Sequence, residues 1–341
     1  MTGSAAVGRD AAVLVLDVGG TSVDGAVVTA DGRVVGGIRR FPSPEDNDAA
    51  TVIGRLAALL SELRRSAGHA GVDATAVGVG IPGPFDYERG VSWMSHKLAA
   101  LRGLDLEGPL RRATGLPVRF CNDAAAFTLG AWWRQHPTAP RLVGITIGTG
   151  LGSGFVVGGR PAGDQEGAPV GGEVWNAPFR DGILEDAVSG RAVSRVYRQR
   201  SGGRRIGAGA IAERARHGDV AAVAAFSELG DALGEGLAAA AAGFSPTRVV
   251  VGGRVADAFD LFGPRAETVF ARAAGTRTPF DAAARPDLAL IGIARHVAAT
   301  GFGAARSAPG SPRLRSGPTA GTSDAARSGH GDTPPKGGKR T

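Results

Sequence analysis

Three glycine-rich turns, each directly after a short apolar run, constrain the fold of this chain most strongly. They are residues 17–21 (DVGGT), residues 148–152 (GTGLG) and the pair Gly252 and Gly253. Glycine after a strand lets backbone N–H groups approach a phosphate with no Cβ in the way. One such turn would indicate little, since tight turns need glycine for their own geometry. Three at strand ends, two of them with a threonine hydroxyl, favour an α/β protein that binds phosphate.

Around these turns, the predicted strands and helices repeat one plan. Apolar runs and turn dipeptides predict strands at 12–18, 23–28, 33–38, 77–81, 118–121, from 142 onward, 154–158 and 249–251. Apolar stripes at helical spacing predict helices at 49–67, up to 114, 124–133, 186–199, 221–242 and within 286–299. Twice, a β-hairpin with a Gly/Thr turn precedes helices. The sequence therefore predicts two α/β lobes with duplicated sheets and a cleft between them.

The chain divides by composition into four segments. Residues 1–11 form an N-terminal extension, 12–123 the first lobe, 124–304 the second lobe and 305–341 a basic tail. We expect the helix at about 286–299 to pack back on the first lobe. The tail has seven basic and two acidic residues, a net charge of +5 out of +7, so the rest is nearly neutral. We expect a disordered, solvated tail, with contact to nucleic-acid phosphates as the alternative, and no specific nucleic-acid partner.

Composition excludes several classes of protein. The 341 residues are 43% hydrophobic and 21% charged, which is ordinary for a globular protein with a sizeable core. The sequence has no apolar run of ~18 residues and no basic N-terminal segment followed by an apolar one, so neither a membrane helix nor a secretory signal is expected. The single cysteine, Cys121, excludes an internal disulfide framework and a cysteine-cluster zinc site within one chain. A cytoplasmic protein is therefore expected.

Two carboxylates stand beside the predicted strand ends. Asp17 ends an apolar strand next to the first glycine turn, where a hydrated Mg²⁺ that bridges phosphates could use it. Asp123 follows a short strand and heads a predicted helix. An aspartate in that place is either a catalytic carboxylate or the N-cap of the helix, and the local pattern leaves both open.

The ordered set of motifs resembles one family. DVGGTSVDGAVV, GVGIPGPFDYERG, NDAAAFTLGA, TIGTGLGSGF, GGE and VVVGG occur in the order and spacing seen in ROK-family proteins (repressors, open reading frames, kinases), from about residue 12 to residue 303. The kinases of this family are bacterial sugar kinases of the actin-like ATPase superfamily. The resemblance implies an α/β protein with the two-lobed actin-like (ribonuclease H-like) fold, duplicated mixed β-sheets and a central cleft. It also implies a kinase that uses ATP and Mg²⁺.

The resemblance assigns roles to individual residues. Asp123 is implied to be the general base that takes a proton from the attacking sugar hydroxyl. The residues implied to bind ATP and its phosphates are Asp17, Gly19, Gly20, Thr21, Gly148, Thr149, Gly150, Gly152, Gly252 and Gly253, with Asp17 also holding Mg²⁺ through water. The residues implied to bind the substrate are Lys97, Asn122, Asp123, Glu173, Asn176 and Glu185.

Departures from the family pattern change the predicted substrate site. Many members place a histidine that binds sugar and zinc where this chain has Asn176, and then carry a CxCGxxGC zinc loop that this sequence lacks. Because zinc needs about four ligands, usually Cys or His, no structural zinc is expected. Lys97 stands at about the position of a sugar-binding asparagine, although a solvent-facing loop lysine is the alternative.

The phosphate-binding positions are thus intact, while the sugar-reading positions have changed. We expect a kinase for the exocyclic primary hydroxyl of a hexose-like polyol, and slightly favour a C7-cyclitol of the valienone or valiolone type in antibiotic (aminocyclitol) biosynthesis. The alternative is a glucokinase or another hexose 6-kinase. A non-catalytic, sugar-sensing regulator is less favoured, because Asp17, Asp123 and Thr149 are retained. The resemblance also favours a homodimer, and no membrane partner is expected.

Overall fold

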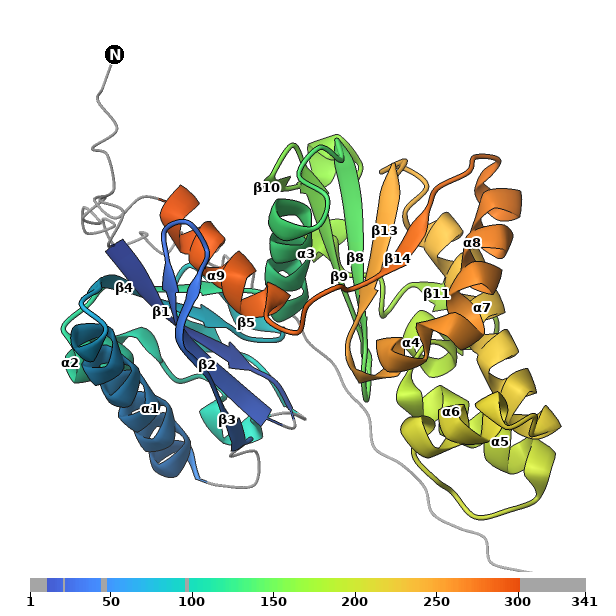
Figure 1. Cartoon of the computed structure of the whole chain (residues 1–341), viewed down its shortest axis with the longest axis horizontal. Coiled ribbons are helices and arrows are strands. Elements are labelled where there is room, and N and C mark those ends of the chain that lie inside the picture. The colour runs from blue at the N-terminus through green and yellow to red at the C-terminus, as the bar shows by residue number, and fades with distance from the viewer. Residues whose placement is uncertain (1–10, 21, 44–47, 96–97, 301–341) are drawn as a thin grey trace, which may run out of the picture. The chain divides into compact units, whose positions relative to one another are not determined.

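The structure is a computed structural model that describes residues 11–20, 22–43, 48–95 and 98–300. All of these residues belong to one structural unit, Met1–Phe302. Two five-stranded sheets form the frame of this unit (Figure 1), and helices cover both faces of each sheet.

The first sheet begins with an antiparallel hairpin and continues with parallel strands. In spatial order its strands are β3 (Val34–Pro42), β2 (Ser22–Thr29), β1 (Ala11–Val18), β4 (Asp73–Gly80) and β7 (Val118–Cys121). Strand β2 runs antiparallel to both β1 and β3, whereas β1, β4 and β7 run parallel to one another. Because parallel strands have their carboxyl ends at one edge of a sheet, the residues that follow β1, β4 and β7 meet there.

The second sheet repeats the pattern of the first. In spatial order its strands are β10 (Arg160–Pro161), β9 (Leu151–Val157), β8 (Arg141–Ile147), β13 (Arg248–Gly252) and β14 (Phe280–Ala282). Strand β9 runs antiparallel to both β8 and β10, whereas β8, β13 and β14 run parallel. In each sheet, a glycine-rich turn joins the first strand to its antiparallel neighbour. The predicted α/β fold with duplicated mixed sheets is therefore confirmed.

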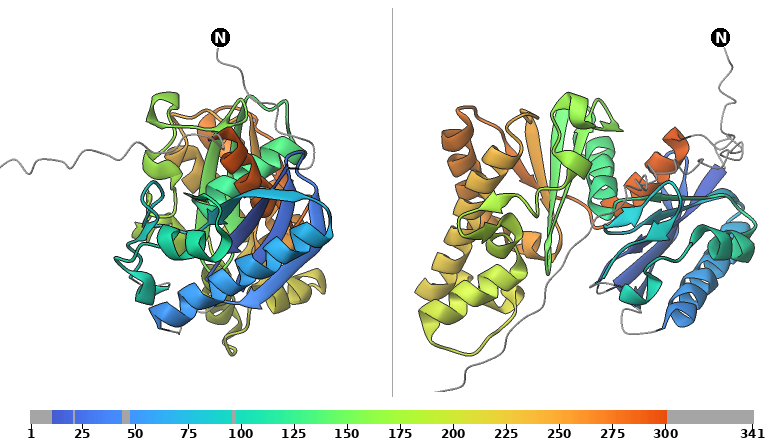
Figure 2. Two further views of the ribbon diagram at one scale, coloured as in Figure 1. Left: turned by 90° about the vertical axis from the view of Figure 1, so that its left-hand side faces the viewer. Right: turned by 180° about the vertical axis from the view of Figure 1, so that it is seen from behind.

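Helices and two short hairpins complete the fold (Figures 1 and 2). The helices are α1 (Ala49–His69), α2 (Glu107–Thr114), α3 (Asp123–Arg134), α4 (Leu184–Ala187), α5 (Gly190–Ser201), α6 (Ala208–Arg216), α7 (Val220–Ala240), α8 (Phe259–Ala274) and α9 (Leu288–Ala299). The hairpins pair β5 (Phe85–Asp86) with β6 (Val91–Ser92) and β11 (Pro178–Phe179) with β12 (Gly182–Ile183), and short 3₁₀ helices occupy Ala99–Leu101, Asp164–Glu166, Val170–Gly172 and Arg254–Ala258. None of the helices in the described part of the chain combines the length and apolarity that crossing a bilayer requires.

The alternation of side chains along the strands explains how each sheet is packed between helices. In the first sheet, Leu14 faces the core with α1 and α2, whereas Val13 faces α9. In the second sheet, Val143 faces the core with α7 and α8, whereas Leu142 faces α3. Figure 2 shows from two further sides how these helices cover the sheets.

Helices α3 and α9 cross at two glycines. A Cβ atom on Gly292 would overlap the carbonyl oxygen of Ala126, and one on Gly130 would overlap the carbonyl oxygen of Leu288. The lack of a side chain at both positions lets the two helix backbones touch. Since α9 also covers one face of the first sheet, residues from both ends of the described chain share one core.

The structure differs from the sequence-based expectation in the second half of the chain. The single helix predicted over 186–199 is two helices, α4 and α5, because Ser189 accepts a hydrogen bond from Ala192 N–H and begins a new helix. Helices α6 and α8 and strand β14 have no counterpart in the prediction. Within α8, Pro264 lies inside the helix, at a residue that ordinarily predicts a break.

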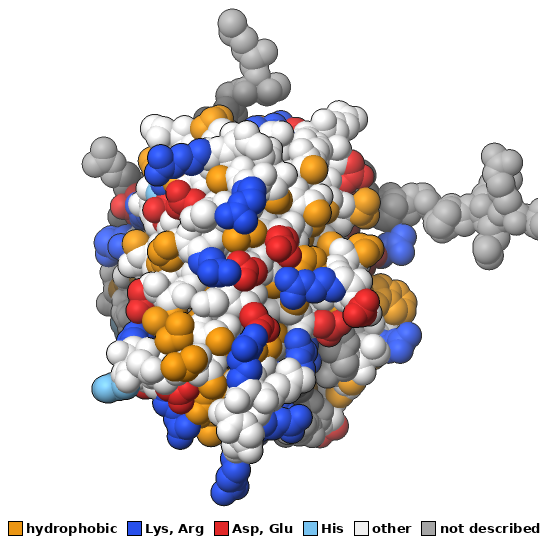
Figure 3. Space-filling model, turned by 90° about the vertical axis from the view of Figure 1, so that its right-hand side faces the viewer, with side chains coloured by type: hydrophobic (Ala, Val, Ile, Leu, Met, Phe, Trp, Pro, Cys, Tyr) orange, Lys and Arg blue, Asp and Glu red, His pale blue; other side chains and the backbone are white. Residues whose placement is uncertain are grey.

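Charges of both signs are interspersed over the face that Figure 3 shows. Among helices α5 to α8, ion pairs between neighbouring elements include Arg265 with Asp231 and Arg200 with Glu228. Such exposed pairs contribute only ~0–1 kcal/mol each. The buried contacts between sheets and helices therefore dominate the stability of the fold.

Candidate active site

The carboxyl ends of three neighbouring strands bring Asp17 and Asp123 together. Asp17 of β1 lies opposite Gly80 of β4, and Gly80 lies opposite Cys121 of β7. Asp123 follows Cys121 by two positions and is the first residue of α3. A Cβ atom on Gly80 would lie 3.7 Å from the Cα atom of Asp123, so Asp123 lies against these strand ends.

Asn122, and not Asp123, is the N-cap of helix α3. The Oδ1 atom of Asn122 accepts a hydrogen bond from the backbone N–H of Ala125 at 3.0 Å. Asp123 lies in the first helical turn, where its Oδ1 atom accepts from the N–H of Ala124 at 2.9 Å. The alternative that Asp123 is the N-cap is therefore wrong.

Negative charge accumulates around Asp17. Burial, followed by the charges of Asp123 and Asp24, raises the pKa of Asp17 to about 8, and the charge of Arg40 acts against this increase. Clustered carboxylates disfavour one another's ionisation, and a cation relieves that repulsion. Among the described residues, no three such side chains come together as a metal site. Asp17 alone could serve as one of the one or two carboxylates that Mg²⁺ takes together with water and the phosphates of a substrate.

The first two glycine turns lie at equivalent places in the two sheets. In the first, the N–H of Gly19 donates to the carbonyl of Ser22 at 3.0 Å. In the second, the N–H of Gly148 donates to the carbonyl of Gly150 at 2.9 Å, and the N–H of Gly190 in α5 donates to the carbonyl of Gly148 at 2.8 Å. Among the described residues, no atom lies within 4 Å of the place that a Cβ atom on Gly148 would occupy. The second turn therefore has open space of the kind that a phosphate group could fill.

The third glycine pair has a packing role of its own. A Cβ atom on Gly252 would lie 2.5 Å from the ring of Phe127, and one on Gly253 would lie 2.6 Å from the carbonyl oxygen of Ile147. Gly253 also has a φ angle of 83°, a backbone conformation that residues with a side chain rarely adopt. Both glycines are thus required by the contacts of β13 with α3 and β8. The contact with Ile147 also brings Gly253 beside the second turn, which begins at the next residue.

Strand β9 lies directly on the first turn of α3. A Cβ atom on Gly152 would be 3.0 Å from the Cβ atom of Ala124, and one on Gly154 would be 2.8 Å from the carbonyl oxygen of Ala124. Because Asp123 precedes Ala124, this contact brings Asp123 next to the end of the second glycine turn. Asp123 therefore lies near that turn as well as near Asp17.

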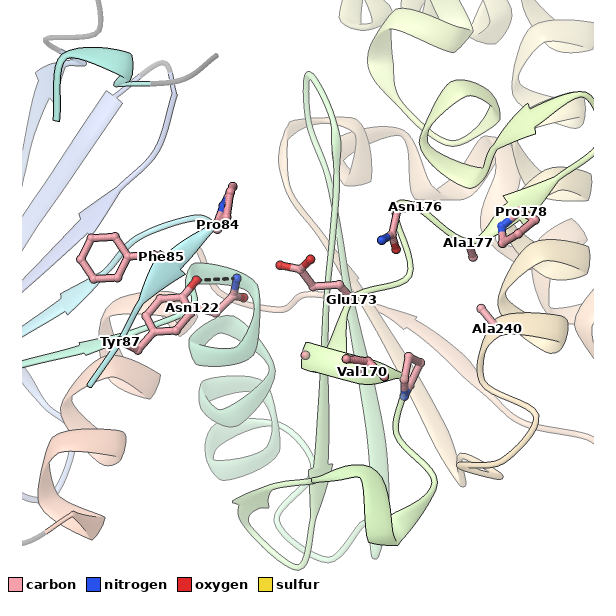
Figure 4. Close-up of a pocket in the computed structure, with 13 residues that line it drawn as sticks. Pro84, Phe85, Tyr87, Asn122, Val170, Glu173, Asn176, Ala177, Pro178 and Ala240 are labelled. Carbon is pink, nitrogen blue, oxygen red and sulfur yellow. Dashed lines mark hydrogen bonds between the residues drawn. The ribbon is translucent and has the colours of Figure 1, made fainter. Parts of the chain in front are cut away.

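A cavity of about 640 Å³ opens beside Asn122 (Figure 4). It is lined by residues of the 83–87 segment, by Asn122, by residues of the 169–178 loop and by Ala240 of α7. Three of the residues predicted to bind substrate line it, namely Asn122, Glu173 and Asn176. In Figure 4 the Glu173 carboxylate points toward the side of the cavity where Asn122 and Tyr87 lie.

Hydrogen bonds hold the polar side chains of this cavity. The Tyr87 hydroxyl accepts from Nδ2 of Asn122 at 3.2 Å and donates to the carbonyl of Ile81 at 3.2 Å. Burial raises the pKa of Tyr87 above its ordinary value, so the phenol stays protonated. The indole N–H of Trp175 donates to Oε2 of Glu173 at 2.8 Å. The sequence left open whether Tyr87, which lies within the GVGIPGPFDYERG motif, lines the pocket, and in the structure it does.

Asp123 and Glu185, the other described residues that were predicted to bind substrate, do not line the cavity. The Oε2 atom of Glu185 accepts from the N–H of Leu151 at 2.9 Å, and its Oε1 atom pairs with Arg191 at 2.5 Å. Glu185 thus supports the second glycine turn. Thr21 and Lys97 lie outside the described residues.

Comparisons with known proteins agree with this geometry. A family model described as "ROK family" matches residues 13–283. The chain is 31% identical over 281 residues to a glucokinase of Thermotoga maritima (74% of this chain, 86% of the relative), and 29% identical over 273 residues to a glucokinase of Streptomyces coelicolor (72% and 83%). The crystal structure of a ROK hexokinase from Thermus thermophilus matches with a TM-score of 0.71 and 27% identity (85% of this chain, 98% of that chain). A ROK family glucokinase from Streptomyces griseus in complex with glucose and AMPPNP matches with a TM-score of 0.71 and 26% identity (84% and 99%).

The fold and the site thus define the class, which is that of sugar kinases with the actin-like ATPase fold. The chain belongs to the ROK family. It is an ATP-dependent sugar kinase, a phosphotransferase with an alcohol group as acceptor. The predictions of family, fold and enzyme class are confirmed.

Proposed function

We propose that this protein is a hexose 6-kinase that transfers the γ-phosphate of ATP to the exocyclic primary hydroxyl of a glucose-type sugar. The observation that carries the proposal is the position of Asp123, next to Asp17 and the second glycine turn and one residue from the cavity-lining Asn122. The glucokinase relatives support a hexose acceptor, as does the solved glucokinase complex with glucose and AMPPNP. These findings favour the hexose alternative over the C7-cyclitol that the sequence slightly favoured.

Asp123 acts as the general base in this proposal. Its carboxylate takes the proton of the attacking hydroxyl as that oxygen approaches the γ-phosphorus in line with the leaving group. Asn122, Glu173 and Asn176 bind further hydroxyl groups of the sugar from the cavity wall. Because their hydrogen bonds fix the ring, the reacting hydroxyl is held beside Asp123 rather than left to diffuse.

The nucleotide lies at the glycine turns in this proposal. The N–H of Gly20 and the open space at Gly148 receive phosphate oxygens, while the N–H groups of Gly19 and Gly148 hold the two turns in shape. Gly252–Gly253 lie near the adenosine. Asp17 holds Mg²⁺ through water, and the bound metal neutralises charge on the phosphates. The hydroxyl of Thr149 adds a donor to the same phosphates.

A C7-cyclitol is the second candidate acceptor, and Asn176 is the observation that favours it. Asn176 lines the cavity at the position where the resemblance leads one to expect a histidine. An amide offers two donors and an acceptor, whereas a neutral imidazole offers one of each, so the two groups select different hydroxyl patterns. A cyclitol of this type keeps the exocyclic CH₂OH that the reaction needs.

Coupled ADP release with Mg-ATP over a panel of acceptors tests the proposal. The panel contains glucose, mannose, fructose, N-acetylglucosamine, N-acetylmannosamine, valienone, validone and 2-epi-5-epi-valiolone. We expect the highest kcat/KM with glucose or mannose. Turnover confined to the cyclitols would replace the hexose with the second candidate. Sugar binding without turnover of any acceptor would overturn the kinase and favour a sensing role.

A further inference from the structure

One face of the first sheet changes from apolar to charged along its strands. Near the start of β1, Val13 packs under α9 together with Val28 of β2. At the other end of β1, Asp17 lies opposite Asp24 of β2, and Asp24 lies opposite Arg40 of β3. Residues directly opposite one another share a face of the sheet. These three side chains therefore form a row on one face, which we call the charged row.

Asp24 and Arg40 make a two-pronged ion pair. The Nε atom of Arg40 lies 2.7 Å from Oδ1 of Asp24, and the Nη2 atom lies 2.6 Å from Oδ2. The Asp24 side chain is 15% exposed, whereas the Arg40 side chain is 68% exposed. Within the described ranges, the Arg40 side chain makes no other hydrogen bond. Its guanidinium is thus held on one edge and keeps further N–H donors for a ligand on the other.

The neighbouring arginine shows that this orientation is specific to Arg40. Arg39 points to the opposite face of β3, where it binds Glu62 and Ser66 of α1. Arg39 thus ties the strand to a helix, as expected of a structural residue. Arg40 makes no such link to a helix, so its charge needs another explanation.

The charge of Arg40 acts on the phosphate edge of the sheet. Arg40 stands in the same row as Asp17, with Asp24 between them. The hydrogen bond with Asp24, and then its charge, raise the pKa of Arg40 above the ordinary value. Strand β2 lies between β3 and β1, and Asp24 holds the guanidinium of Arg40 over β2, on the side toward the end of β1. A phosphate at the end of β1 meets the carboxyl groups of Asp17 and Asp24, so a positive partner such as Arg40 favours its binding.

We infer that Arg40 is a phosphate-binding residue, which contacts the terminal phosphates of the nucleotide beside Asp17, and that Asp24 is the residue that positions it. This inference rests on the proposed location of ATP at the first glycine turn. A guanidinium presents its N–H groups as a planar fork that matches two phosphate oxygens. Asp24 fixes the orientation of that fork before the nucleotide arrives.

Calorimetric titration of the full-length chain with ADP and with AMP, both with Mg²⁺, tests the inference. AMP lacks the terminal phosphates, so it reports only on the rest of the nucleotide site. In Arg40→Gln we expect about tenfold weaker ADP binding, the effect of one lost charge-assisted hydrogen bond at a partly exposed site, with AMP binding unchanged. Asp24→Asn keeps the positive charge of Arg40 but weakens the ion pair that orients its guanidinium. Its loss of ADP affinity should therefore be smaller than that of Arg40→Gln.

Arg39→Gln is the matched control, because it removes the same charge from the opposite face of the same strand. It should bind ADP as tightly as the unmodified chain. Unchanged ADP affinity in Arg40→Gln, or an equal loss of ADP and AMP binding, would overturn the role of Arg40. If the unmodified chain bound AMP and ADP equally, the site would make no favourable contact with the terminal phosphate, and the inference would be overturned. Failure to bind either nucleotide would instead overturn the proposed function.

Discussion

Asn122 and Asp123 are adjacent polar residues at the start of one helix, yet their surroundings suit them to different tasks. Asn122 caps the helix with one end of its amide and contacts Tyr87 with the other, so it fixes both the helix and the cavity wall. Asp123 is not the N-cap, and its carboxylate lies near Asp17. The division of roles follows from the hydrogen bonds and not from residue type.

Replacement of Asp123 with Asn should remove the base while keeping its shape. We expect kcat to fall by roughly 10²- to 10⁴-fold, the usual contribution of a positioned general base, with ADP affinity unchanged. Steady-state kinetics and calorimetry measure the two quantities. Asp73→Asn, at an exposed residue at the far end of β4, is the control. A variant that kept more than a tenth of the turnover would remove Asp123 from the reaction.

A second prediction at this scale concerns Asn176, which lines the cavity and lies in an exposed loop. Its side chain should therefore bind the substrate and contribute little to the stability of the fold. In Asn176→Ala we expect the KM of the sugar to rise about tenfold, since a hydroxyl of the substrate loses its partner. The KM of ATP should not change. Asp181→Ala, in the same loop region but not in the cavity wall, is the control. Equal effects on both substrates would place Asn176 outside the sugar site.

At the scale of elements, the contact of α3 with α9 depends on glycine. In Gly292→Ala the methyl group would overlap the carbonyl oxygen of Ala126, and this backbone atom cannot move without shifting helix α3. We expect the free energy of unfolding to fall by about 3 kcal/mol or more, measured by chemical denaturation. Gly54→Ala, at an exposed position inside α1 with no described atom within 4 Å, should instead stabilise by ~0.5–1 kcal/mol. Similar effects of the two substitutions would contradict the tight crossing.

The elements that the sequence predicted are those with strong local signals. The turn Asp31–Gly32 and the alternating strands around it predicted the first hairpin, and the stripe of α1 predicted that helix. Helix α8 was missed because Pro264 interrupts its pattern, and β14 because three residues carry little signal. A single helix was predicted where Ser189 starts a new one, since a cap inside an apolar stripe is easily overlooked.

The candidate site divides in the same way. Motifs gave Asn122, Glu173 and Asn176, which the fold gathers around one cavity. They could not give Ala240, which reaches the same cavity from a helix far along the chain, nor the pairing of Asp24 with Arg40. Those contacts are set by strand register and helix packing, which no local pattern encodes.

At the scale of the whole molecule, the last helix of the described chain, α9, packs against its first strand, β1. The first sheet is followed along the chain by the second, and α9 then packs on β1 and β4 of the first sheet. Ile293 of α9 fills the space beside Gly78 and Gly80 of β4. Loss of α9 packing would therefore expose the first sheet as well as α3. His296 lies on this helix, and burial lowers its pKa below the ordinary 6.5, against a raising effect of the Phe120 backbone.

This lowered pKa makes stability depend on pH in a defined direction. Below pH 6.5 the unfolded chain binds a proton at His296 that the folded chain resists, so the free energy of unfolding should fall as the pH drops, by at most about 1.4 kcal/mol per pH unit for one group. Above pH 6.5 the effect is absent. Denaturation of His296→Gln between pH 7.5 and 5.5 should show a shallower decline than the unmodified chain, while His69→Gln, at the exposed end of α1, should not. Equal slopes in all three proteins would mean that His296 takes up its proton without disturbing α9.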